Sequence, residues 1–134
     1  MEKFAVLQAG ASIPERVWIP TDMQLRQYAE ASGDYNPIHL DEKFAQQVGL
    51  GGVIAHGMLT MAQVGAMLTQ WLNGEGSISQ FEVRFQNMVR PGDTIHCTGV
   101  IKEKLANAVV CDVKALNQKS MEIIAGSAVI TFKD

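Results

Sequence analysis

Residues 34–39, Asp-Tyr-Asn-Pro-Ile-His, place a carboxylate and an imidazole on either side of a proline. Asp34 and His39 are five positions apart. In an α-helix this spacing rotates the two side chains by about 500°, so that they diverge, and in a strand it sends them to opposite faces. The two side chains therefore converge only on an irregular turn. Asn36-Pro37 supplies one, because proline cannot continue a helix and pushes the preceding residue towards extended backbone.

Such a turn could support general acid–base chemistry, because an imidazole with an unperturbed pKa of about 6.5 changes charge near neutral pH. Asp34 could hold a water molecule, orient His39 or take part in proton transfer. Taken alone, the same six residues are also typical of an ordinary loop.

The elements on either side of the turn are helical. Residues 21–24, Thr-Asp-Met-Gln, have the capping-box pattern and predict that a helix begins there and leads into the turn. Asp41 and Glu42 then favour a short helix through Gln47, because acidic groups stabilise a helix N-terminus.

The following segment, from Phe44 to Gly74, contains no Asp, Glu, Lys or Arg. Within it, residues 49–53 are a flexible glycine-rich stretch expected to border a substrate channel, and residues 57–72 predict a helix that is apolar almost all round. A membrane span needs about 20 apolar residues, and this helix is shorter and interrupted by polar side chains. We expect a helix buried on all sides within a soluble domain, with no membrane partner.

The C-terminal half follows a period of two. Phe81, Val83 and Phe85 alternate with polar residues and are expected to face the core. Residues 94–104 and 108–117 predict a hairpin across 105–107, residues 121–133 a last strand, and residues 16–19 an early one. Strands in succession, without helices between them, imply an antiparallel sheet. The apolar helix beside that sheet suggests that the sheet curls around the helix. We expect one α+β domain over residues 1–134.

Charge and cysteine content indicate which partners and which cellular compartment to expect. The net charge of −3 and the scattered Lys and Arg residues argue against a nucleic-acid partner. The N-terminus has no secretory pattern, and Cys97 and Cys111 have no metal-ligand spacing. We therefore expect reduced cysteines and a cytoplasmic location.

Two blocks of sequence resemble a known family. Residues 28–39, Tyr-Ala-Glu-Ala-Ser-Gly-Asp-Tyr-Asn-Pro-Ile-His, with Ala45 six residues later, resemble the signature of the MaoC-like dehydratases. This family includes the R-specific enoyl-CoA hydratases and the (3R)-hydroxyacyl-ACP dehydratases. Residues 54–60, Ile-Ala-His-Gly-Met-Leu-Thr, are similar to the family's entry into its central helix. The resemblance implies a hotdog fold, and a homodimer or a heterodimer with another hotdog subunit whose active site lies near the interface.

The activity that the resemblance implies is reversible dehydration of a (3R)-3-hydroxyacyl thioester to the trans-2-enoyl thioester in fatty-acid metabolism. Asp34 and His39 would be catalytic, although the sequence does not divide the proton transfers between them, and Asn36 would support substrate binding. Gly57 opens the central helix, and a main-chain N–H at that positive end could stabilise the thioester oxygen.

Neither a metal nor a cofactor is expected. Asp34, His39, Asp41 and His56 have the right ligand types, but no pair of them has a recognisable zinc spacing, and this elimination needs no metal. His56 is expected to anchor main chain through a hydrogen bond, and His96 to be structural or exposed.

Two other functions stay open. The chain could be a hotdog subunit that only provides an acyl pocket in a heterodimer, although retention of Asp34 and His39 disfavours this. It could also be a hotdog thioesterase that directs water at the carbonyl carbon. The carrier could be coenzyme A or acyl carrier protein, and the candidate cations for either are Arg84, Arg90, Lys102 and Lys104.

Overall fold

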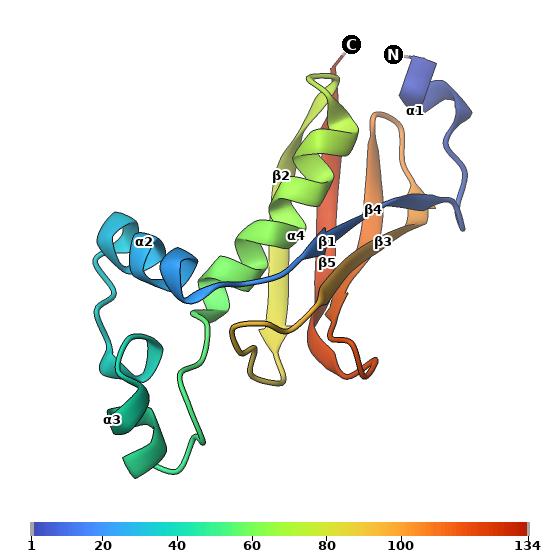
Figure 1. Cartoon of the computed structure of the whole chain (residues 1–134). Helices are drawn as coiled ribbons and strands as arrows, with labels where there is room; N and C mark the ends of the chain where they lie inside the picture. The colour runs from blue at the N-terminus through green and yellow to red at the C-terminus, as the bar shows by residue number, and fades with distance from the viewer. Residues whose placement is uncertain (1, 134) are drawn as a thin grey trace.

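A computed structural model describes residues 2–133 as one antiparallel sheet curled around one long helix (Figure 1). The strands follow the order β1-β3-β4-β5-β2, and every neighbouring pair is antiparallel. Their bounds are β1 Ser12–Trp18, β2 Gly76–Phe85, β3 Ile95–Lys104, β4 Ala108–Leu116 and β5 Glu122–Phe132. The helices are α1 Glu2–Val6, α2 Asp22–Ser32, the 3₁₀ turn η1 Pro37–His39, α3 Glu42–Gln47 and α4 Gly57–Leu72. The α+β prediction with a wrapped central helix is confirmed.

The core lies between α4 and the concave face of the sheet. Val64 and Leu68 of α4 are fully buried, as are Ile95, Val109 and Ile130 of the strands. Burying each such side chain stabilises the fold by about 1.5–3 kcal/mol. None of the helices within residues 2–133 has the length and apolar character that a membrane crossing requires.

Most predicted elements are confirmed, since α4 has the predicted bounds and β3 and β4 form the predicted hairpin. The prediction that α4 is buried on all sides is wrong, because the sheet covers one side of the helix and leaves Met58, Thr69 and Gln70 exposed. Strand β1 begins earlier than predicted, and its Pro14 is tolerated because β1 is an edge strand. The prediction for Phe85 is wrong, because 52% of its surface is exposed. Phe85 is the last residue of β2, where its ring lies against Gly57.

The segment that carries the turn leaves the sheet and returns to it. Figure 1 shows α2 and α3 extending away from the sheet at the end where α4 begins. Two main-chain bonds tie the returning chain in place. The N–H of Ile54 donates to the oxygen of Ile38 at 3.1 Å, and the N–H of Ala55 donates to the oxygen of Val89 at 2.7 Å.

Candidate active site

In the turn between α2 and α3, short polar side chains accept the hydrogen bonds of main-chain N–H groups. Helix α2 ends at Gly33, whose φ of 78° is left-handed. The Asp34 carboxylate then accepts the N–H of Asn36 at 3.2 Å, and the Asn36 side chain accepts the N–H of Ile38, also at 3.2 Å. Aspartate and asparagine favour turns because they bond main chain two residues on. The predicted irregular turn is confirmed, with η1 as its last part.

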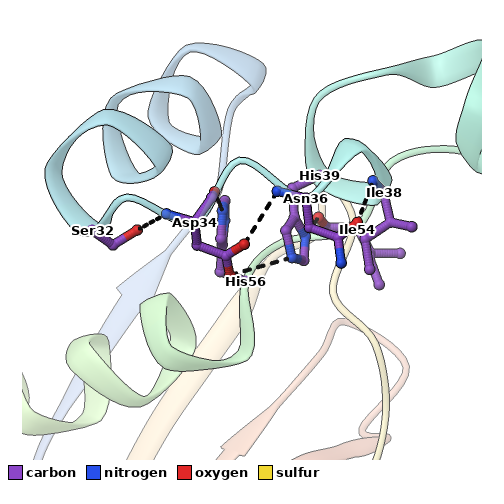
Figure 2. Close-up of polar contacts among 7 residues, drawn as sticks. All are labelled: Ser32, Asp34, Asn36, Ile38, His39, Ile54 and His56. Carbon is purple, nitrogen blue, oxygen red and sulfur yellow. Dashed lines mark hydrogen bonds and ion pairs between the residues drawn. The ribbon is translucent and has the colours of Figure 1, made fainter.

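The turn brings Asp34 and His39 together (Figure 2). The side chain of His39 is 8% exposed and that of Asp34 is 50% exposed, and His39 Nε2 lies 3.9 Å from Asp34 Oδ2. This separation is too long for a direct hydrogen bond. His39 Nδ1 lies 2.7 Å from the carbonyl oxygen of Ile54. Because a carbonyl oxygen only accepts, Nδ1 carries a proton, and in the neutral ring Nε2, on the side of Asp34, holds the lone pair.

The stretch that leads into Ile54 is held by a clamp formed by Glu42 and Arg90. The Arg90 guanidinium donates to the carbonyl oxygens of Leu50 and Gly52, and the Glu42 carboxylate accepts the N–H of Val53 at 3.2 Å. Gly52 has a φ of 147°, and a Cβ there would lie 2.7 Å from Glu42 Oε1. The glycine-rich stretch is therefore tied down, and the guanidinium proposed for a carrier is bonded to main chain.

His56 lies directly behind the pair. It is 2% exposed, and its Nε2–H donates to the main-chain oxygen of Asp34 at 3.1 Å, which confirms the predicted main-chain anchor. Its ring also stacks on His39, with centroids 3.8 Å apart and planes 25° apart, and contacts Tyr28 edge-on. Burial is the main cause that lowers the pKa of His56, which favours the neutral ring. No local pattern in the sequence pointed to the stacking, because it joins residues 17 positions apart.

Asp34, His39 and His56 have potential metal-ligating atoms within 4.8 Å of one another. Their arrangement does not suit a metal, because ring nitrogens must converge on one ion at about 2.0–2.1 Å. Here the two rings are stacked nearly parallel, and one N–H of each donates to a carbonyl oxygen. The geometry favours a hydrogen-bonded cluster.

A cavity of about 170 Å³ opens beside His39 and the first turn of α4. Its lining is mostly apolar: Ile54, Ala55, Phe85, Met88, Val89, Ile123 and Ile124, with His39, Gly57, Thr60 and Asn87. Gly57 is the first residue of α4, and its N-cap, His56, forms no side-chain capping bond within the described residues. The first N–H groups of a helix lack intrahelical partners and lie at its positive end. A Cβ on Gly57 would lie 3.0 Å from the Phe85 ring, so glycine suits this position.

A sheet wrapped around a central helix, with an Asp–His pair and an apolar cavity at the N-terminus of that helix, defines a hotdog-fold protein with an enzyme-like site. The family model of the MaoC like domain matches residues 7–122, and the chain belongs to this family. The solved structure of R-hydratase PhaJ1 from Pseudomonas aeruginosa is similar, with a TM-score of 0.90 and 32% identity, over 98% of this chain and 85% of that one.

Two curated relatives are similar in sequence. Fatty acid synthase subunit beta of Schizosaccharomyces pombe is 36% identical over 110 residues, which are 75% of this chain and 5% of that protein. The 3-hydroxybutyryl-CoA dehydratase of Methylorubrum extorquens is 44% identical over 70 residues, which are 51% of this chain and 44% of that protein. The chain thus spans less than half the length of each of these relatives.

Proposed function

We propose that this protein hydrates trans-2-enoyl thioesters to (3R)-3-hydroxyacyl thioesters and catalyses the reverse dehydration, as part of fatty-acid metabolism. Asp34 and His39 are its catalytic residues. The observation that carries this proposal is the position of His39 Nε2, which lies 3.9 Å from Asp34 Oδ2 beside an apolar cavity that His39 and Gly57 both line. The printed names of the hydratase and dehydratase relatives support the same chemistry.

The tautomer of His39 supports a division of duties. In dehydration, His39 Nε2 takes a proton from C2, and the electron pair moves onto the thioester oxygen. The carbonyl then re-forms, the C2=C3 double bond forms and the C3–O bond breaks, while the imidazolium returns a proton to the hydroxyl, which leaves as water. Asp34 orients that hydroxyl and stabilises the imidazolium. Hydration is the reverse, and His39 ends each cycle neutral.

The transient charge on the thioester oxygen needs a donor. The N–H of Gly57 is proposed for this role, since α4 has 16 residues and begins at the cavity. Losing one such donor in other enzymes costs about 2.7–4 kcal/mol of barrier. Asn36 is proposed to support the substrate indirectly, because its side-chain oxygen is already bonded within the turn.

The size of the cavity suggests a short acyl chain. Its 170 Å³ is small beside the roughly 300–1,000 Å³ of sites for drug-sized ligands. Coenzyme A is the first carrier to test, with acyl carrier protein as the alternative. Of the cations proposed to bind the carrier, Lys104 has its Nζ 4.5 Å from the centre of the Phe4 ring in α1. Figure 1 places α1 at the opposite end of the molecule from α2 and α3, so Lys104 is far from the proposed site.

A second hotdog subunit, either another copy or a related chain, is the proposed protein partner. Strand β2 is an edge of the sheet, and such an edge offers unpaired main-chain groups to another strand. Exposed apolar side chains lie at its end and on the following loop: Phe85 and Met88. Native mass of the purified protein, alone and with candidate partner chains, tests this.

A cytoplasmic location is also proposed, because Cys97 and Cys111 are free and buried.

Turnover of crotonyl-CoA tests the function. We expect loss of the conjugated enoyl absorbance, formation of the (3R)-hydroxy product and no release of free thiol. Release of thiol without hydration would support the thioesterase alternative. No turnover with CoA- and ACP-bound substrates, in the purified dimer or heterodimer, would contradict the proposal and favour a pocket-providing subunit.

A further inference from the structure

One nitrogen of His56 has no hydrogen-bond partner within residues 2–133, although it is buried. With Nε2–H donating to the Asp34 carbonyl, this nitrogen, Nδ1, is an unpaired acceptor. A buried polar atom without a partner costs about 1–3 kcal/mol. An apolar side chain would avoid that cost, so the reason for an imidazole must lie in its other contacts.

Those contacts reach both proposed catalytic residues at once. The Nε2–H bond of 3.1 Å holds the main chain of Asp34, and the ring face packs on His39 at a centroid distance of 3.8 Å. On another side, Tyr28 of α2 meets the His56 ring edge-on at 4.7 Å. His56 therefore lies between α2 and the ring of His39, with little freedom to move.

We propose that His56 is a positioning residue, which fixes the Asp34 main chain and the plane of the His39 ring relative to the N-terminus of α4. This inference rests on the proposed function of Asp34 and His39. Because His56 directly precedes Gly57, the same residue joins the turn to the first N–H of the helix. The acid–base pair and the proposed oxyanion donor thus share one anchor.

The charge state of His56 fits this role. Three ionisable side chains face its ring, those of Asp34, His39 and Tyr28. A neutral His56 adds no second cation beside His39 when that ring carries the transferred proton. An amide would keep the donor and lose the stacked ring, whereas a phenyl ring would keep the stack and lose the donor.

Two substitutions separate these contributions. His56→Gln keeps an N–H donor without the ring, and His56→Phe keeps the ring without the donor. We expect kcat per folded protein to fall about 10- to 100-fold in each, because displacement of reacting groups by about 1 Å has effects of this size. KM should stay within about twofold, because His56 does not line the cavity. His96→Gln, at a surface histidine, is the matched control.

A readout independent of turnover is the nitrogen spectrum of His39 in protein labelled at histidine. The wild type should show the Nδ1–H tautomer, and both variants should show a mixture of tautomers. Unchanged His39 signals, with wild-type kcat where turnover is measurable, would overturn the inference. If the wild type hydrates no enoyl thioester, the proposed function is refuted instead, and the His39 spectrum alone then tests whether His56 positions the His39 ring. If both variants fail to fold, Tyr28→Leu loosens His56 from the other side and should broaden the same signals.

Discussion

The core around α4 and the segment of residues 33–56 that carries the site are held together by different forces. In the core, side chains such as Val64 and Leu68 are fully buried and pack in every direction. In the site segment, positions depend on single directional bonds, such as those from His39 to Ile54 and from Arg90 to Gly52. Core substitutions should therefore change stability with little effect on the proposed site, whereas substitutions in the site segment should change activity more than stability.

The largest expected effect is on the acid–base pair. Asp34→Asn and His39→Gln should each lower kcat for crotonyl-CoA hydration by about 10²–10⁴-fold, the usual contribution of a positioned acid or base. Thermal unfolding should be nearly unchanged in Asp34→Asn, because Asp34 is half exposed. His39→Gln should also lower the unfolding temperature, because the buried ring loses its stacking contact with His56. Steady-state turnover together with calorimetry measures both. Near wild-type rates in both folded variants would refute the site assignment.

Leu68→Ala tests the opposite half of the comparison. It should reduce the free energy of unfolding by about 2–5 kcal/mol, since it removes a fully buried side chain from the centre of α4. The folded fraction should keep the wild-type kcat, because Leu68 does not line the cavity. Urea unfolding monitored beside activity checks this, with Met58→Ala on the exposed side of α4 as the control. A proportionate fall in kcat per folded molecule would show that core and site are coupled.

Arg90→Lys probes the clamp on the stretch that leads into Ile54. Lysine cannot reproduce the two-pronged guanidinium contact with Leu50 and Gly52. We expect kcat to fall by about tenfold and stability by about 1 kcal/mol, the worth of one to two net hydrogen bonds. Arg84→Lys, on exposed strand surface, should change neither. If KM for the CoA substrate rose instead while kcat held, Arg90 would contact the carrier.

The smallest expected effect is a pH dependence of stability from His56. Burial lowers the pKa of His56 in the folded state below the ordinary histidine value of 6.5. The unfolded state therefore binds the proton more readily, and the free energy of unfolding should be greatest above pH 6.5 and decline as the pH falls below it. Urea titrations on both sides of this value measure the decline. His56→Phe should show a shallower decline, and an equal one would assign the effect to other groups.

Local patterns predicted the regular elements well. The bounds of α4 follow from its largely apolar, charge-free run between Gly57 and Asn73-Gly74, and the β3–β4 hairpin follows from alternation on both sides of a short turn. Phe85 was placed in the core because it continues the same alternation. Alternation reports which face of a strand a residue occupies, and not how fully that face is covered: at the end of β2 the Phe85 ring lies beside Gly57, the first residue of α4, and stays 52% exposed.

The residues of the proposed site could be singled out from the sequence, but the residues that hold them in position could not. Asp34, Asn36, His39 and Gly57 were all singled out from two short blocks. The roles of Ile54, Glu42 and Arg90 were not, because a main-chain carbonyl leaves no mark in a sequence and a charged side chain looks the same whether it binds main chain or solvent.

Local sequence was enough to predict that Asp34 and His39 share a turn, because proline and short polar side chains restrict the backbone around them. It was also enough to predict the apolar helix at residues 57–72, although not that one of its sides is exposed. Which nitrogen of His39 lies near Asp34, and the stacking of His56 on the His39 ring, could be known only from the folded structure. Those features depend on contacts between residues distant in the chain, which form only when the returning segment packs against the end of α4.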